Sequence, residues 1–183
     1  TGMLKKLAVH TPQLVKYRRH KGVTLTLTGE KIALEIIRHH RLIELYLAEA
    51  LDVPWDRVHD EAEKWEHVLS EDLEDRIDAR LGHPTADPHG APIPGRDGTM
   101  VALTDNRLAD LTAGEKGIVT EVSDHDSTLL RFLGGLNMYP TTEFSVIDVQ
   151  PFNGPVIIRI GNAQHALGRE VAEHILVKIT SER

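Results

Sequence analysis

The chain contains the stretch His59-Asp60-Glu61-Ala62-Glu63-Lys64-Trp65-Glu66-His67. On a helix, at about 100° per residue, four side chains of metal-binding types from this stretch fall within an arc of roughly 100°. These four residues are His59, Glu63, Glu66 and His67. Val58, Ala62, Trp65 and Leu69 form a neighbouring apolar stripe, so the polar face would border a packed core. The spacing therefore predicts a helix that carries candidate metal ligands.

A second pair of such residues lies on an earlier segment. His40 and Glu44 are four positions apart, which places them on one helix face and lets them complete a coordination sphere begun on another element. Histidine and glutamate are also common on solvated helix faces, so one such pair alone usually has no metal role. With two segments that carry the pattern, spacing alone gives metal binding and a plain solvated surface equal weight.

Length and composition set outer limits on the class of protein. With 183 residues, the chain is long enough for one large domain or for two or three small ones. It contains no cysteine, which excludes a disulfide scaffold, thiolate metal sites and a cysteine nucleophile. No apolar run approaches the roughly 20 residues that cross a bilayer, and the chain begins with no secretory signal. We therefore expect a soluble, cytoplasmic protein with no membrane partner.

The distribution of charge is uneven. The net charge is −7, but the first 29 residues contain six of the 21 basic residues and none of the 28 acidic ones. A basic block joined to an acidic body is typical of a protein with one nucleic-acid-contacting end. A solubilising basic tail is an alternative of equal weight.

The first 27 residues have the pattern of part of a winged helix. Residues 1–8 have helical spacing without a preceding cap, so we expect the chain to begin inside an element. Residues 14–17 and 23–26 alternate like strands, and a basic turn ending at Gly22 joins them. A helix followed by a two-stranded ribbon with a cationic tip is the back half of a winged helix.

The middle of the chain is predicted to be helical. Residues 29–51 have helical periodicity, and Pro54 suits the first turn of the next helix, which carries the metal face. Ser70 is the expected N-cap of a third helix, and Gly82 its C-terminal stop. The segment 82–98 holds four of the nine prolines, so we expect a loop or linker there.

The C-terminal part changes to short strands and turns. Residues 115–122, 143–149 and 156–160 have the composition of strands, and residues 127–136 that of one short helix. A segment of this length with several short strands favours a small β-barrel.

Several motifs together resemble one protein family. The most specific are His40-Arg41-Leu42-x-Glu44, the run 58–70, and Asp87-Pro88-His89-Gly90-Ala91-Pro92-Ile93-Pro94-Gly95. They resemble the diphtheria toxin repressor family of metal-dependent transcriptional regulators, over essentially the whole chain. Residues 111–117, 140–144 and 165–168 are similar to the SH3-like domain of that family and to the small ferrous transport protein FeoA.

The resemblance implies a multidomain α+β fold. Residues 1–27 would be the C-terminal part of a winged helix-turn-helix, and residues 28–82 an all-α dimerisation and metal-binding domain. Residues 83–99 would form a Pro/Gly-rich linker, and residues 100–183 an SH3-like β-barrel of the FeoA type. The chain would thus be truncated at the N-terminus, starting at the recognition helix and lacking the metal ligand that the family's first helix supplies.

The resemblance also implies a function and a set of site residues. The chain would be a homodimeric repressor of metal-uptake genes, not an enzyme, that binds double-stranded operator DNA when loaded with metal. His40, Glu44 and His59 would form an ancillary metal site, with Asp126 near the place of a further ligand, and Glu63, Glu66 and His67 a primary site. DNA contacts would come from Thr1, Gly2, Lys5, Lys6, Arg18, Arg19 and Lys21.

The resemblance further indicates which metal the site would hold. Glu63 stands at the position where the iron-responsive members have cysteine. The manganese-responsive members have glutamate at that position. Manganese is therefore the expected cofactor, with ferrous iron the second choice. Two alternatives stay open from the residues: a helical di-metal hydrolase, and a metal-binding module that docks a peptide on its C-terminal barrel.

Overall fold

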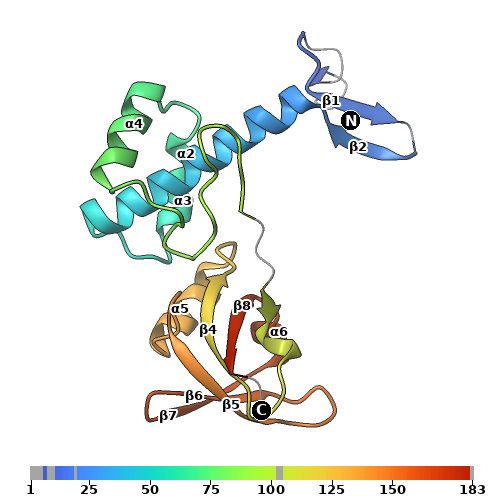
Figure 1. Ribbon diagram of the computed structural model, residues 1–183, viewed down its shortest axis with the longest axis vertical. Helices are drawn as coiled ribbons and strands as arrows, with labels where there is room; N and C mark the ends of the chain where they lie inside the picture. Colours follow the sequence, from blue (N-terminus) through green and yellow to red (C-terminus); the bar gives the residue numbers. More distant parts are fainter. Residues whose placement is uncertain (1–5, 8–10, 19, 102–104, 182–183) are drawn as a thin grey trace.

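The computed structural model describes residues 6–7, 11–18, 20–101 and 105–181 (Figure 1). The first part is an antiparallel hairpin of β1 (Val15–Arg18) and β2 (Gly22–Leu25), in which Val15 pairs with Leu25. Lys21 N donates to the carbonyl of Arg18 at 2.9 Å and closes the turn. The predicted two-stranded ribbon is thus confirmed. Thr1, Gly2, Lys5 and Arg19, four of the expected DNA contacts, lie outside the described residues.

A long helix, α2 (Leu27–Leu51), leads from the hairpin into the helical part of the molecule (Figure 1). It begins where the side chain of Thr26 accepts from the backbone N of Gly29 at 3.1 Å, which is a standard N-cap. A Cβ at position 29 would lie 2.0 Å from the carbonyl oxygen of Leu14, so glycine lets the helix start close against the hairpin. The helix ends at Asp52, which adopts a left-handed conformation.

Helices α3 (Val58–Trp65) and α4 (Glu71–Arg80) follow and complete the helical part. Ser70 caps α4 through its hydroxyl, as predicted. Pro54 lies before α3 and not in its first turn, because its carbonyl accepts from the N of Arg57 and closes a separate turn. Helix α3 packs against α2 through the apolar side chains Ile43, Leu47, Val58 and Ala62. Helix α4 packs against α2 through Leu42, Leu45 and Ile77.

The proline-rich segment after α4 folds back over the helices. Asp87 and His89 are buried together with Ala91 and Ile93, and Ala86 forms an isolated antiparallel bridge with Pro92. The N of Val122 donates to the carbonyl of His89 at 2.9 Å, which joins this loop to the C-terminal sheet. The segment expected to be a linker therefore packs on the helices and is also hydrogen-bonded to the C-terminal sheet.

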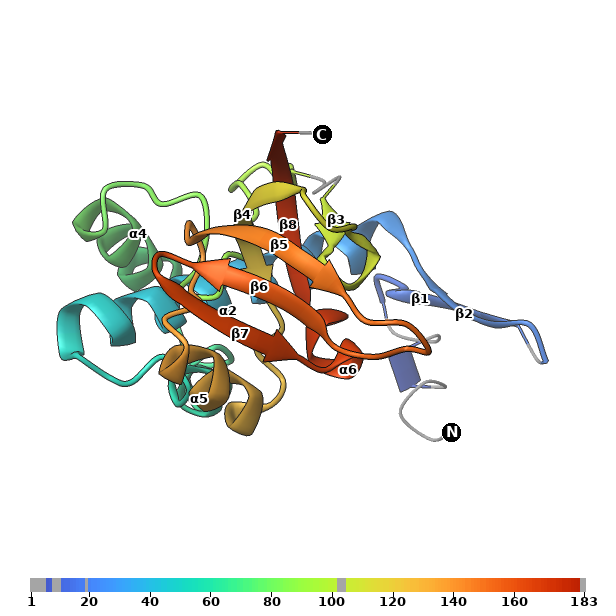
Figure 2. The same cartoon turned by 90° about the horizontal axis from the view of Figure 1, so that it is seen from below.

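The C-terminal part is an antiparallel sheet with small helices at its ends (Figure 2). Its elements are β3 (Asn106–Arg107), the 3-10 helix η1 (Leu108–Asp110), β4 (Lys116–Val122), α5 (Ser127–Gly135), β5 (Glu143–Val149), β6 (Val156–Ile160), β7 (Ala163–Leu167), α6 (Arg169–Ala172) and β8 (Ile175–Ser181). The strand order is β3-β8-β4-β5-β6-β7. Within the described ranges the edge strands β3 and β7 do not pair with each other, so the sheet is open and a closed SH3-like barrel is not confirmed.

The fold as a whole is α+β, with a hairpin and the helices α2, α3 and α4 in the first half and a sheet with short helices in the second. Fully buried side chains such as Leu130, Leu133, Ile158 and Val177 form the core of the sheet part. Among the described residues, none of the helices combines the length and the apolar character needed to cross a membrane.

Candidate metal centre

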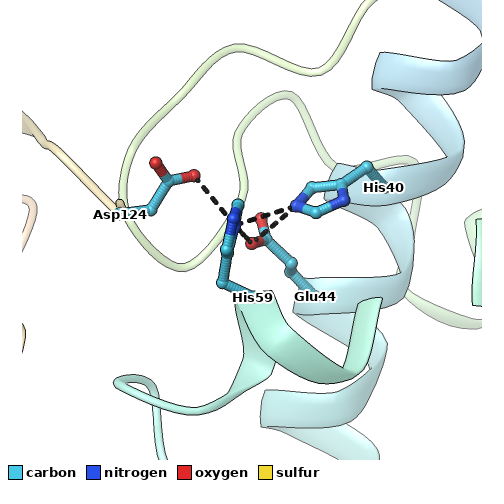
Figure 3. Close-up of side chains that lie close together, drawn as sticks. All are labelled: His40, Glu44, His59 and Asp124. Atoms are coloured by element: carbon cyan, nitrogen blue, oxygen red, sulfur yellow. Dashed lines mark hydrogen bonds and ion pairs between the residues drawn. The ribbon is translucent and has the colours of Figure 1, made fainter. Parts of the chain in front are cut away.

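Three of the predicted ligands converge between α2 and α3 (Figure 3). His40 Nε2 lies 3.0 Å from Glu44 Oε1 and 3.1 Å from His59 Nδ1, and the last two atoms are 3.1 Å apart. Glu44 is fully buried, whereas His40 and His59 are partly exposed. Apolar packing between α2 and α3 fixes the two backbones, so the convergence of the three atoms is built into the fold.

This triangle of atoms fits a divalent cation. Two ligand atoms that lie about 2.1 Å from one ion, at right angles to each other, are about 3 Å apart. The three separations in the structure are close to that value. Two facing imidazole nitrogens and a carboxylate oxygen also offer lone pairs to the same point, which one cation satisfies at once. The residues present therefore fit a metal ion.

The imidazole of His40 is oriented by a second carboxylate. Its Nδ1 lies 2.6 Å from Glu66 Oε2, the usual arrangement in which a ligating histidine donates its other ring proton. Burial opposes protonation of this ring, but hydrogen bonds to Glu44 and Glu66 and their charges outweigh it and raise the pKa of His40 from 6.5 to about 9. The carboxylates thus favour a cation here, either a proton or a metal ion.

A fourth candidate ligand comes from the C-terminal part. Asp124 follows β4, and its Oδ2 lies 3.5 Å from His59 Nδ1; with His40, Glu44 and His59 it forms a group with the spacing of metal ligands. Asp126, which the sequence suggested near this place, instead caps α5 by accepting from the N of Thr128 at 2.7 Å. In the structure, Asp124 is thus the acidic residue of this segment that lies in the group, two positions before Asp126.

The side chains of the second predicted ligand set, Glu63, Glu66 and His67, do not converge as closely as those of His40, Glu44 and His59. Glu66 Oε1 lies 3.3 Å from His67 Nε2, while Glu63 Oε1 lies 3.8 Å from the Nε2 of His59. The side chains of Glu63 and His67 are 64% and 67% exposed. His67 stands in the turn after α3, which ends at Trp65, so the continuous helix assumed from the sequence stops just before it.

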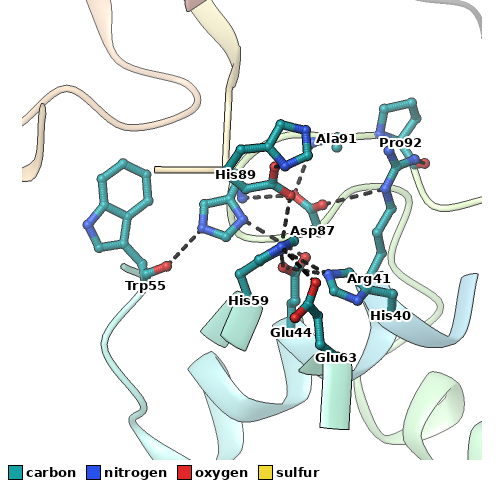
Figure 4. A network of polar contacts seen from close by, with 12 residues as sticks. His40, Arg41, Glu44, Trp55, His59, Glu63, Asp87, His89, Ala91 and Pro92 are labelled. Carbon is teal, nitrogen blue, oxygen red and sulfur yellow. Dashed lines mark hydrogen bonds and ion pairs between the residues drawn. The ribbon is translucent and has the colours of Figure 1, made fainter. Parts of the chain in front are cut away.

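A second polar cluster lies behind Glu44 (Figure 4). Glu44, Asp87 and His89 are all buried, and each offers a ligand atom within 4.8 Å of the others. Burial and the charge of Glu44 raise the pKa of Asp87 from 3.8 to about 7, although backbone hydrogen bonds from His89 and Ala91 and the charge of Arg41 act in the opposite direction. Asp87 and His89 stand in the motif of residues 87–95, from which no site role is predicted by sequence.

The expected DNA-contacting side chains that can be described are Lys6, Arg18 and Lys21, all exposed. Arg18 and Lys21 flank the hairpin turn, at the far end of α2 from α3 and α4 (Figure 1). The metal site and the cationic hairpin are therefore joined by one continuous helix.

Comparison with known proteins identifies the class. Residues 26–95 match the family model of the iron dependent repressor, metal binding and dimerisation domain, and residues 106–179 match the FeoA domain. The iron-dependent repressor IdeR of Mycobacterium leprae is 31% identical over 177 residues, which cover 90% of this chain and 76% of the relative. The diphtheria toxin repressor of Corynebacterium diphtheriae is 37% identical over 92 residues, covering 50% of this chain and 41% of the relative.

Solved structures agree with this assignment. A manganese-dependent transcriptional repressor in complex with manganese superposes with a TM-score of 0.89 at 37% identity, covering 97% of this chain and 82% of the other. The manganese regulator SloR gives 0.80 at 28% identity, with coverages of 98% and 82%. The fold and the site thus define a metal-dependent transcriptional repressor and not an enzyme. The chain belongs to the family of the iron-dependent repressor IdeR and the diphtheria toxin repressor.

Proposed function

We propose that this protein is a manganese-responsive repressor that binds operator DNA as a homodimer and turns off genes for metal uptake. The single observation that carries the proposal is the triangle of His40, Glu44 and His59, closed from the C-terminal part by Asp124. An ion held there would be bound at once by side chains from α2, α3 and the segment after β4. Bound metal would supply positive charge to a carboxylate-rich junction and so favour one arrangement of the two halves. A regulator of chromosomal genes would act in the cytoplasm.

The donor set supports manganese first and ferrous iron second. It contains imidazole nitrogen and carboxylate oxygen and no sulfur, a combination that suits these hard or borderline ions. Zinc prefers four tetrahedral ligands, whereas manganese and ferrous iron favour a six-coordinate geometry. We therefore infer that zinc binds without producing the arrangement that DNA binding requires.

We propose a second metal site at Glu63, Glu66 and His67. Glu66 already approaches His67, and its other oxygen approaches His40, so this carboxylate would connect the two sites. The exposed side chains of Glu63 and His67 leave room for a ligand from elsewhere in the protein.

Exposed apolar side chains support dimerisation through the helical part. Trp65, Val68 and Leu73 are 42%, 81% and 48% exposed around the end of α3 and the start of α4. Apolar residues gathered at one place on a surface are typical of a protein interface. A symmetric dimer would present two hairpins to a palindromic operator, as paired DNA-binding domains do.

In this proposal the DNA-contacting segment ends near residue 27 and the helical dimerisation part spans residues 28–82. The segment 83–99 packs over the metal site, and residues 100–183 form the FeoA-like part. The hairpin residues Arg18 and Lys21, with Lys6, would contact phosphates and set the position of the protein on the duplex.

The test uses the full-length protein, freed of metal, and a library of random duplex DNA. We expect duplexes to be enriched in Mn²⁺ and not in chelator, and affinity for the enriched duplex to follow the order Mn²⁺, Fe²⁺, Zn²⁺ at matched free metal. His40→Gln should abolish the enrichment, whereas His83→Gln, which changes an exposed histidine paired with Asp78, should not. Equal activation by zinc would refute the metal assignment. Failure to enrich with any metal would refute the regulator proposal.

A further inference from the structure

We propose that Glu44 bridges two cations, with Oε1 facing the site of His40 and His59 and Oε2 facing a second, buried site completed by Asp87 and His89. The inference extends the proposed function, because the shared carboxylate belongs to the metal site described above. This buried site lies between Glu44 on α2 and the loop that carries Asp87 and His89 (Figure 4).

Three buried atoms at this place lack a hydrogen-bond partner among the residues that the structure describes. They are Glu44 Oε2, Asp87 Oδ2 and His89 Nδ1. Glu44 and His89 are 0% exposed and Asp87 is 6% exposed. Leaving one such atom without a partner costs about 1–3 kcal/mol, so three together indicate that a ligand occupies the space between them.

The separations between these atoms are those of ligands around a common ion. His89 Nδ1 lies 3.9 Å from Glu44 Oε2, too far for a direct hydrogen bond. Two atoms bound to one ion at about 2.1 Å can be up to about 4.2 Å apart. The three groups together lie within 4.8 Å of one another, so small side-chain rotations bring all three onto one ion.

The protein holds the remaining atoms of these side chains in fixed roles. His89 Nε2 lies 2.8 Å from the carbonyl oxygen of Trp55 and must donate to it, which leaves Nδ1 with a free lone pair. Asp87 Oδ1 accepts from the backbone N of His89 and of Ala91 at 2.8 and 3.0 Å, which aims Oδ2 at the cluster. Fixing of the distal ring nitrogen by a backbone carbonyl is characteristic of histidine that ligates metal.

A cation explains the cluster better than a buried water molecule. When Asp87 is ionised, all three of these atoms are acceptors, and a water molecule has two hydrogens to donate. One acceptor would therefore stay unpaired with water, whereas an ion accepts a lone pair from each. Arg41 Nε lies 3.7 Å from Asp87 Oδ2, and its Nη1 donates to the carbonyl of Pro92. Arg41 thus offsets part of the negative charge without occupying the site.

The direct test is anomalous scattering at the manganese edge from crystals of the full-length protein grown with MnCl₂. Besides any peak at the site proposed at Glu63, Glu66 and His67, we expect one peak beside His40 and His59 and another bound by Glu44 Oε2, Asp87 and His89. A peak at the first position with a water molecule or nothing at the second would overturn the inference and leave the proposed function standing. No peak at either position would overturn both.

Stoichiometry provides an independent readout. Metal analysis after dialysis should give one Mn²⁺ equivalent per chain fewer for His89→Gln than for the wild-type protein. The matched control is His83→Gln, which should bind as many equivalents as the wild type. If His89→Gln does not fold, Asp87→Asn serves instead, because its amide oxygen retains the two backbone hydrogen bonds. Unchanged stoichiometry in the folded variant would overturn the inference.

Discussion

The Nδ1 atom of His59 lies 3.5 Å from Oδ2 of Asp124, so a side chain of α3 meets one from the segment that follows β4. This contact joins the helical part to the sheet at the point where His40 and Glu44 also converge. Metal binding at this point would therefore be sensitive to how the two parts are placed.

Asp124→Ala should weaken Mn²⁺ binding by about tenfold or more, because it removes a carboxylate that the other three side chains cannot replace. Calorimetric titration with Mn²⁺ measures the change. Asp126→Asn is the matched control: it changes a nearby acidic residue, and asparagine caps a helix about as well as aspartate. Equal Mn²⁺ affinity in the two variants would show that Asp124 is no ligand.

The stability of the metal-free protein should fall as the pH rises from 5 to 9. The raised pKa of Asp87 makes a contribution to the free energy of unfolding that is fully present below pH 3.8 and is lost as the pH rises through about 7. The raised pKa of His40 gives stability that is full below 6.5 and is lost through about 9. Urea unfolding in chelator at several pH values measures this, and Asp87→Asn should flatten the part of the curve below pH 7. Constant or increasing stability over this range would contradict the assignment of both groups.

Much of the fold follows from the sequence because local patterns determine it. The hairpin, α2 and α4 appear where their periodicity and capping residues predict them, with Ser70 at the N-cap of α4. Strand β8 was missed although Ile175, Val177 and Ile179 alternate there as in a strand. Its pairing with β4 and β3 joins segments far apart in sequence, and periodicity carries no information about such partners.

The site was predictable to the extent that helical spacing defines it. His40 and Glu44 are one turn apart on α2, and His59 faces them from α3. Asp124, Asp87 and His89 could not be assigned in this way, because they lie on irregular segments whose position depends on long-range packing. The hydrogen bond from His89 Nε2 to the carbonyl oxygen of Trp55 is one such contact.

Glu74→Gln should destabilise the protein by about 3 kcal/mol, because it breaks a buried ion pair and leaves the charge of Arg38 with its longer contact to Asp78, at 3.3 Å. Glu74 Oε1 lies 2.5 Å from Arg38 Nε and Oε2 lies 2.9 Å from His39 Nε2, and all three side chains are buried. Urea denaturation gives the difference in unfolding free energy. Asp72→Asn breaks an exposed pair with Arg76 and should cost less than about 1 kcal/mol. Similar losses in both variants would refute the buried network as a source of stability.

Arg18→Ala and Lys21→Ala should each reduce the salt dependence of operator binding by about one unit of slope, since each removes one phosphate contact. Manganese affinity should stay unchanged, because the hairpin lies at the other end of α2 from the metal site. Arg159→Ala removes an exposed arginine on β6 and is the control. If the salt-dependence slopes of all three variants equal that of the wild type, the hairpin does not contact DNA.

We propose that an ion held by His40, Glu44 and His59 switches the protein to its DNA-binding form. The most direct test measures operator affinity of the full-length protein by fluorescence anisotropy while free Mn²⁺ is varied, for the wild type and for His59→Gln. We predict that Mn²⁺ raises the affinity of the wild type by at least tenfold and leaves that of His59→Gln at its metal-free value. An equal increase in both proteins, or tight operator binding by the wild type in chelator, would contradict the account.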